Sequence, residues 1–198
     1  MLRAGDRVGI VGHNGAGKST LLKAVCRVYE SDYGRVTVNG RIAPLLEIGA
    51  GFHPEFTGRE NIYLNGAILG YTRQQLRAIE AEVISFAELE EFIDTPVKYY
   101  SIGMYMRLAF SLATAVHPDI LILDEVFAGG DARFVAKARQ RIRDLVDKAD
   151  IMIMVSHDAE LVRTMCNRVI WLDHGKLVDD GPTDQVLPHY LTGRAGGG

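Results

Sequence analysis

One segment of nine residues restricts the fold of this chain more than any other. Gly12–Thr20 reads GHNGAGKST, which fits the pattern G-x-x-x-x-G-K-[ST] of a loop that wraps around phosphate groups. It follows a short apolar run, Arg7–Val11, and precedes a helical stretch, Lys18–Val28, which is the context that such a loop requires. A glycine turn with a capping Ser-Thr could match the bare pattern by chance, but the strand–loop–helix context favours phosphate binding.

The residue types in this loop explain how it would hold a nucleotide. Gly12, Gly15 and Gly17 let the backbone pass close to phosphates with its N–H groups turned inward. Lys18 would supply positive charge to the β- and γ-phosphates, and the Ser19 hydroxyl is placed to bind Mg²⁺. The helix that starts here offers its positive dipole end to the anion. The predicted nucleotide-binding residues of the loop are Gly12, His13, Asn14, Gly15, Ala16, Gly17, Lys18, Ser19 and Thr20.

A second acidic pattern lies downstream. Ile120–Glu125 reads ILILDE, a buried strand that ends in two carboxylates. Buried strands of an α/β protein end at the sheet edge where ligands are held. There Asp124 would bind Mg²⁺ through water, and Glu125 would orient or deprotonate the attacking water. The alternative is a strand followed by a solvated acidic turn, but the phosphate-binding loop upstream favours catalysis.

The remaining patterns alternate strands with helices. Asn39-Gly40 and Asp173–Gly175 are turn signals that predict two hairpins. Helical patterns run from Glu60 to about Val116, with two breaks, and from about Ala132 to Asp147. The predicted strands are 7–11, 35–38, 42–46, 120–123, 151–155, 169–172 and 176–178.

This order predicts an α/β fold with a mainly parallel sheet covered on both faces, interrupted by an inserted helical lobe. Residues 1–51 and 117–198 would form the core, and 52–116 the helical subdomain.

Composition and charge exclude several other classes. With 47% hydrophobic and 24% charged residues, the chain is typical of a globular protein. A net charge of −3 gives no electrostatic case for a nucleic-acid partner. No apolar run approaches the roughly 20 residues that cross a bilayer, so a membrane role would need a partner. Cys26 and Cys166 are expected to be buried free thiols, and His13 a surface residue. Four basic residues are expected to form a solvated helix face: Arg133, Arg139, Arg141 and Arg143.

The phosphate-binding loop, the ILILDE strand and Ser156-His157-Asp158 resemble, in this order, the ATP-binding cassette family. Tyr100–Met104 (YSIGM) resembles the family signature Leu-Ser-Gly-Gly-Gln and lies directly before a helix. The resemblance implies a P-loop NTPase fold of the RecA-like type with an inserted α-helical subdomain. It also implies a head-to-tail dimer, in which Ser101 and Gly103 contact the γ-phosphate of ATP held by a second copy.

By the same resemblance, Asp131 belongs to the loop that communicates between the two sites, and His157 is the switch histidine at the γ-phosphate. The implied activity is Mg²⁺-dependent hydrolysis of ATP to ADP and phosphate, with Lys18, Glu125 and His157 as catalytic residues.

Two stretches, EIGAGFHPEFTGRENIYLNG and FIDTPVKYYSIGMYMRLAFS, are similar to cassettes that export cell-surface polysaccharides such as O-antigen or teichoic acid. This similarity implies a bacterial subunit on the cytoplasmic face of the inner membrane, bound there through a separate permease. Phe52, His53 and Phe56 lie where cassettes meet that partner, although core packing explains the two phenylalanines equally well.

Departures from the family pattern leave alternatives open. Ile102 stands where the family has Gly or Ser, and its β-branched side chain would crowd the γ-phosphate. The family's glutamine before the helical lobe is missing, with Glu47 the nearest polar candidate. The chain starts later than other cassettes, as a truncation would, and Tyr29 or Tyr33 would have to replace the adenine-stacking aromatic. The alternatives are a non-hydrolysing interaction module and a soluble cassette ATPase that acts on nucleic acid or ribosomes.

Overall fold

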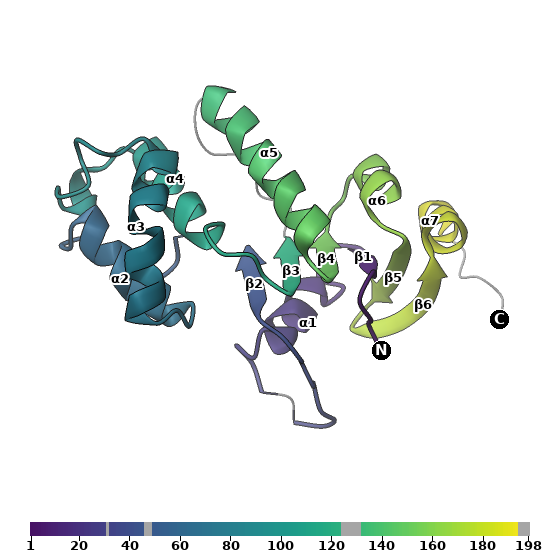
Figure 1. Ribbon diagram of the computed structural model, residues 1–198. Coiled ribbons are helices and arrows are strands. Elements are labelled where there is room, and N and C mark those ends of the chain that lie inside the picture. Colours follow the sequence, from purple (N-terminus) through teal and green to yellow (C-terminus); the bar gives the residue numbers. More distant parts are fainter. Residues whose placement is uncertain (31, 46–48, 124–131, 194–198) are drawn as a thin grey trace. The chain divides into compact units, whose positions relative to one another are not determined.

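The computed structural model describes residues 1–30, 32–45, 49–123 and 132–193 (Figure 1). These residues divide into two compact units, which are described separately below. Those within Met1–Pro44, Pro118–Glu125 and Ala149–Gly198 form the sheet unit, and those within Leu45–His117 and Val126–Lys148 form the helical unit. The subdomain boundaries expected from the sequence stay a prediction.

The sheet unit is built on a six-stranded sheet with the strand order β2-β3-β4-β1-β5-β6. β1 pairs in parallel with both β4 and β5, and β3 pairs in parallel with β4. Only the β5–β6 hairpin is antiparallel among the pairs whose register is defined, so the predicted mainly parallel sheet is confirmed. The strands are β1 (Arg7–Val11), β2 (Ile42–Leu45), β3 (Ile120–Leu123), β4 (Ile151–Val155), β5 (Arg168–Asp173) and β6 (Lys176–Pro182).

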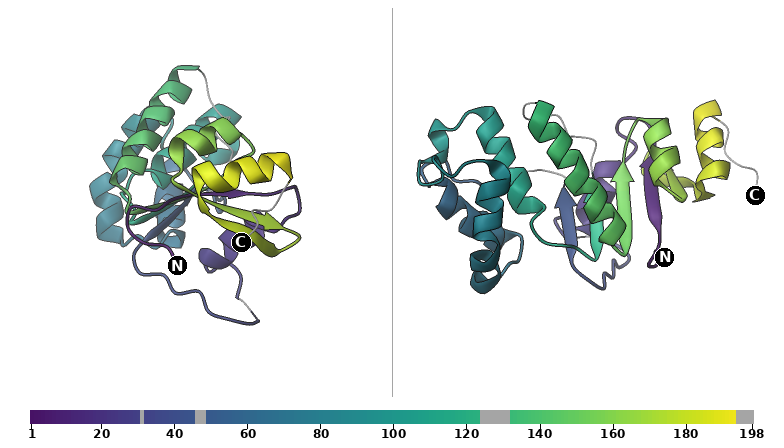
Figure 2. Two further views of the ribbon diagram at one scale, coloured as in Figure 1. Left: turned by 90° about the vertical axis from the view of Figure 1, so that its right-hand side faces the viewer. Right: turned by 45° about the horizontal axis from the view of Figure 1, so that its top comes forward.

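Three helices of the sheet unit surround these strands: α1 (Lys18–Val25), α6 (Ala159–Met165) and α7 (Thr183–Thr192). The right-handed crossover rule places α1 and α6 on opposite faces, because they lead to opposite sides of β1 (Figures 1 and 2). α6 packs so closely on β1 that a Cβ at Gly9 would lie 2.8 Å from Val162 Cγ1. Covered on both faces, the central strands are almost continuously apolar and buried.

The helical unit contains α2 (Gly58–Ile68), α3 (Arg73–Ala87), the 3₁₀ helix η1 (Val97–Tyr99), α4 (Ile102–Ala113) and α5 (Ala132–Lys148). Thr57 and Thr72 begin α2 and α3 with complete capping boxes, each closed by a Glu or Gln three residues later. A core of fully buried aliphatic side chains joins α2, α3 and α4, and a smaller aromatic cluster joins α4 to α5. The predicted helical block and its two breaks are therefore confirmed.

One predicted strand pair is wrong. Residues 35–38 form no strand, and β2 pairs with β3 instead of a hairpin partner. Gly40 has φ +114°, but Asn39 does not share the left-handed geometry that a two-residue type I′ turn requires. The N–H of Arg41 donates to the Asp119 carboxylate at 2.7 Å, which directs the chain after Gly40 toward β3.

Two smaller expectations also need correction. α1 ends at Val25, before the predicted Val28, because Arg27 adopts the left-handed φ of +59°. Cys166 is a buried free thiol as expected, but Cys26, which caps this helix end, is only partly buried. Burial raises the pKa of Cys166 to about 12 and also raises that of Cys26.

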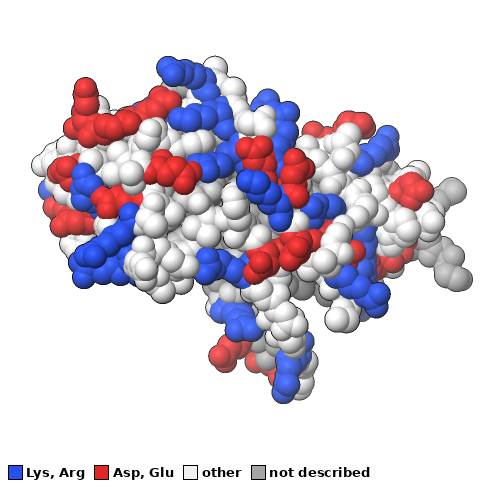
Figure 3. All heavy atoms as spheres, in the orientation of Figure 1, with Lys and Arg blue, Asp and Glu red and all other residues white. Residues whose placement is uncertain are grey.

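The predicted basic face of α5 is solvated except at Arg141. That guanidinium lies 4.3 Å from the centre of the Phe86 ring and 2.5 Å from the Glu82 carboxylate. Arg133, Arg139 and Arg143 are exposed. Over the face shown in Figure 3, positive and negative side chains are interspersed. None of the described helices combines the length and the apolarity that a bilayer crossing needs.

Candidate functional site

The phosphate-binding loop joins the end of β1 to the start of α1 and depends on its glycines. Gly12 has φ +152°, and a Cβ there would lie 2.2 Å from the backbone oxygen of Leu172 in β5. Gly15 and Gly17 have φ +80° and +99°, which side chains disfavour. Gly17 is the N-cap of α1, and no described side chain caps this helix end. The first-turn N–H groups of α1 are thus available to an anion.

Lys18 turns its side chain back over the loop. Its ammonium donates to the carbonyl oxygens of Gly12 at 2.7 Å and His13 at 3.0 Å, and the residue is 7% exposed. A buried cation beside uncapped helix N–H groups is the arrangement that binds phosphate oxygens. Ser19 and Thr20 follow in the first turn of α1 and are exposed, as are Asn14 and Gly15.

His157 lies at the same sheet edge as the loop. β1 and β4 are parallel neighbours, with Ile10 opposite Val155, so the segments after both strands emerge together. A tight turn fixes the backbone around His157: Asp158 Oδ1 accepts the N–H groups of Glu160 and Leu161 at the start of α6. The side chain of His157 is exposed and therefore accessible to a ligand.

Three other predicted site residues, Asp124, Glu125 and Asp131, lie outside the described residues, as does Glu47. The preceding strand β3 ends at Leu123 and is parallel to β4. The chain therefore leaves β3 at the edge where the phosphate-binding loop and His157 also lie.

Ser101 and Gly103 belong to the helical unit, at the start of α4. Ser101 is the N-cap, and its Oγ accepts the N–H of Met104 at 3.2 Å. A Cβ at Gly103 would meet no atom closer than Ser101 Oγ, at 3.8 Å, so this helix end is open. Ile102 is 85% exposed beside it. The structure thus groups the loop with His157 in one unit and places the signature residues in the other.

Two tyrosines hold the signature segment in place. Tyr100 OH donates to the carbonyl oxygen of Phe92 at 2.8 Å, and Tyr105 OH donates to that of Gly49 at 2.6 Å. Burial raises the pKa of Tyr100 to about 12, and it also raises the pKa of Tyr105. Both phenols therefore remain neutral hydrogen-bond donors at physiological pH. Sequence reasoning placed the signature but did not find these anchors, whose partners lie in other segments.

The sequence left open whether Phe52 and Phe56 pack in the core or, with His53, meet a membrane partner, and the two phenylalanines differ in this respect. Phe52 packs against the core of the helical unit, with its ring 5.2 Å from that of Tyr105. Phe56 is 40% exposed, and its ring centre lies 4.5 Å from that of His53, with the two rings tilted by 35°. Core packing therefore accounts for Phe52, whereas Phe56 and His53 form a surface pair.

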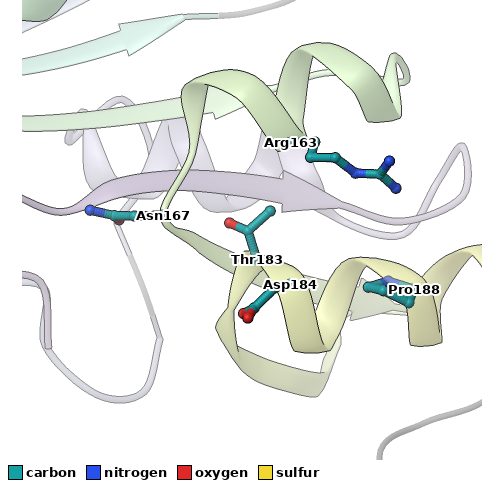
Figure 4. A pocket seen from close by; sticks show the side chains of 5 residues that line it. All are labelled: Arg163, Asn167, Thr183, Asp184 and Pro188. Atoms are coloured by element: carbon teal, nitrogen blue, oxygen red, sulfur yellow. The ribbon is translucent and has the colours of Figure 1, made fainter.

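A separate hollow of about 440 Å³ lies between α6 and α7 (Figure 4). It contains none of the predicted site residues. Its lining residues are Arg163, Asn167, Thr183, Asp184 and Pro188.

The comparisons with known proteins agree with this geometry. The ABC transporter family matches residues 1–128. The O-antigen export system ATP-binding protein RfbB of Myxococcus xanthus is 48% identical over 94% of this chain and 43% of its own length. A protein of the same name from Klebsiella pneumoniae is 46% identical over 94% of this chain and 76% of its own length. The teichoic acids export ATP-binding protein TagH of Lactococcus lactis is 38% identical over 96% of this chain and 40% of its own length. The chain thus spans less than half of two of these relatives.

Solved structures show the same fold. An ATP-binding subunit of an ABC transporter superposes with a TM-score of 0.74 at 22% identity, covering 98% of this chain and 85% of its own. A dimeric ATP-binding cassette, MJ0796, solved with ADP and Pi, gives a TM-score of 0.69 at 22% identity. This match covers 92% of this chain and 88% of the other. The predicted P-loop fold is therefore confirmed, and together the matching sequences place this chain in the ABC transporter family.

Proposed function

We propose that this chain is the ATP-binding and ATP-hydrolysing subunit of an exporter for a cell-surface polysaccharide. The observation that carries the proposal is the phosphate-binding loop, where the buried ammonium of Lys18 is held over the loop at the uncapped start of α1. The names of the relatives, which include O-antigen and teichoic acid export, support the class of cargo.

In the proposed reaction, water attacks the γ-phosphorus of ATP and ADP leaves. Lys18 and the backbone N–H groups of the loop stabilise the negative charge on the phosphates. Glu125 orients or deprotonates the water, and His157 contacts the γ-phosphate from the end of β4. Mg²⁺ would neutralise charge on the phosphates, and Ser19 and Asp124 offer the oxygen ligands that this ion prefers.

The proposed assembly is a head-to-tail dimer. Ser101 and Gly103 would bind the γ-phosphate held by the second copy, since the start of α4 is exposed and open. Asp131 would communicate between the two sites. That a cassette with the same fold was solved as a dimer supports a dimeric assembly.

The proposed membrane partner is a permease subunit, which would hold the chain at the cytoplasmic face of a bacterial inner membrane. The exposed pair His53 and Phe56 supports a contact of this kind. No nucleic-acid partner is proposed, because the net charge is −3 and the charges on the visible face are mixed.

Steady-state phosphate release tests the proposal. With Mg-ATP, the wild-type chain should release phosphate at a rate that rises faster than linearly with protein concentration, and Glu125→Gln should lose this activity. A chain that binds ATP but releases no more phosphate than Glu125→Gln would instead be the non-hydrolysing module.

A further inference from the structure

The phosphate-binding loop is supported from outside by the C-terminal part of the sheet unit. The supporting contacts come from β5, from the turn between β5 and β6, and from α7. Figure 1 labels β5, β6 and α7. All of these elements lie within residues 168–192, whereas the family match covers residues 1–128.

The first support is a backbone contact. The N–H of Gly175 donates to the carbonyl oxygen of Ala16 at 2.9 Å. Ala16 lies between two glycines of the loop and is 3% exposed. Its N–H donates to the His13 carbonyl oxygen at 3.0 Å, the oxygen that also accepts from Lys18. The hydrogen bond from Gly175 therefore fixes the segment of the loop that holds the lysine.

The turn that presents this N–H has a defined geometry. Asp173 and Lys176 pair at the end of the β5–β6 hairpin, and the two residues between them have positive φ. His174 is at φ +44° and Gly175 at +76°, as a type I′ turn requires. No atom lies within 4 Å of a Cβ at Gly175, so a side chain there would act through backbone strain and not through a clash.

The second support is aromatic. The ring of His13 lies 6.3 Å from that of Tyr190 in α7, which in turn lies 5.6 Å from Trp171 in a T-shaped contact. Both separations fall within the range of aromatic pairs. Trp171 is 7% exposed on β5, so these rings connect the loop to the core of the sheet unit.

We propose that the β5–β6 turn and Tyr190 hold the loop in the conformation that receives the β- and γ-phosphates, which makes Gly175 and Tyr190 positioning residues for nucleotide binding. A glycine-rich loop loses much conformational entropy when it becomes ordered. Contacts that order it beforehand raise affinity without touching the ligand. The inference rests on the proposed function only in its choice of ATP as the ligand.

Two variants with matched controls test the inference. Gly175→Val opposes the positive φ, whereas His174→Asn suits it and keeps the N–H of Gly175. Tyr190→Ala removes the ring, whereas Tyr190→Phe keeps it. The dissociation constants of Mg-ATP and of inorganic triphosphate are measured by calorimetry, together with KM and kcat for hydrolysis. Circular dichroism melting verifies that each protein is folded.

Gly175→Val and Tyr190→Ala should each weaken the binding of both ligands by about three- to tenfold relative to their controls, with kcat at saturating ATP unchanged. If Gly175→Val fails to fold, the Tyr190 pair decides. Equal affinities for Tyr190→Ala and Tyr190→Phe, or a loss confined to kcat, would overturn the inference. A wild-type chain that binds neither ligand would overturn the proposed function instead.

Discussion

The two units carry their site residues in different ways. In the sheet unit, Lys18 is buried and its ammonium is held by two carbonyl oxygens, and Gly12 lies against the backbone of β5. In the helical unit, Ser101 and Ile102 are exposed, and a Cβ at Gly103 would meet no atom within 3.4 Å. A group that is ordered before its ligand arrives can bind alone, whereas an exposed helix end needs a surface brought to it. The difference predicts that the sheet unit sets nucleotide affinity, and that the signature residues of the helical unit affect turnover without changing this affinity.

Removal of the loop cation should have the largest effect. Lys18→Met should weaken ATP binding and reduce hydrolysis by about 10²- to 10³-fold, because the phosphate charge loses a buried cationic partner. Calorimetry with Mg-ATP and phosphate-release assays measure the two effects. An affinity within threefold of wild type would show that the loop does not hold the phosphates.

The signature serine should affect turnover without affecting ATP affinity. Ser101→Ala should reduce hydrolysis by about tenfold while the affinity of a dilute single chain for ATP stays unchanged, because Ser101 belongs to the other unit. Loss of its cap on α4 should also cost about 1 kcal/mol of stability. Ser101→Thr, which keeps a hydroxyl cap, is the control for that loss. Weaker ATP binding by the dilute variant would contradict the assignment.

Ile102 gives a prediction of the opposite sign. If its exposed side chain crowds a phosphate when two copies close, Ile102→Ser should raise kcat by about threefold, or roughly 0.7 kcal/mol, without changing the affinity of a single chain. Met106→Leu, a volume-conserving change on the same helix, controls for altered packing. An unchanged or lower kcat for Ile102→Ser would show that this residue does not limit closure.

The smallest effect concerns the stability of the sheet unit. Arg168 donates two hydrogen bonds to the Asp180 carboxylate, which lowers the pKa of Asp180. A lowered pKa in the folded state adds stability above the pKa of the unfolded chain, and that stability is lost as the pH falls through the folded value. Asp180→Asn should therefore cost about 1 kcal/mol at pH 7 and less at pH 3, measured by urea unfolding. An equal loss of stability at both pH values would contradict an origin in the charge of the Asp180 carboxylate.

Local patterns predicted much of the fold. The strands at 7–11, 120–123 and 151–155 match their predicted bounds because each is a short apolar run. The two hairpin signals had different outcomes. His174 and Gly175 both adopt the left-handed geometry, whereas at Asn39-Gly40 only the glycine does, and Asp119 takes the next N–H. The turn signal at Asn39-Gly40 is local, but the path of the chain there depends on the side chain of Asp119, which is far away in the sequence.

In the candidate site, too, local patterns identified some residues and missed others. The loop was predicted from its motif and His157 from the family resemblance, and the structure places both after parallel neighbouring strands at one sheet edge. The sequence predicted the turn at Gly175 but not its hydrogen bond to the loop, and it did not indicate Tyr190, because both residues contact loop residues far away along the chain. No spacing or residue type in the sequence predicts such a contact. Asp124, Glu125 and Asp131, outside the described residues, stay predictions.

A mixing experiment tests most directly whether the loop of one copy and the signature of another copy together form one ATP site. Lys18→Met retains an intact signature, and Ser101→Ala retains an intact phosphate-binding loop. If each ATP is held by the loop of one copy and the signature of the other, a mixed dimer contains one complete site. Phosphate release by an equimolar mixture should then clearly exceed the average of the two variants measured alone at the same total concentration. A rate equal to that average would contradict a site shared between two copies.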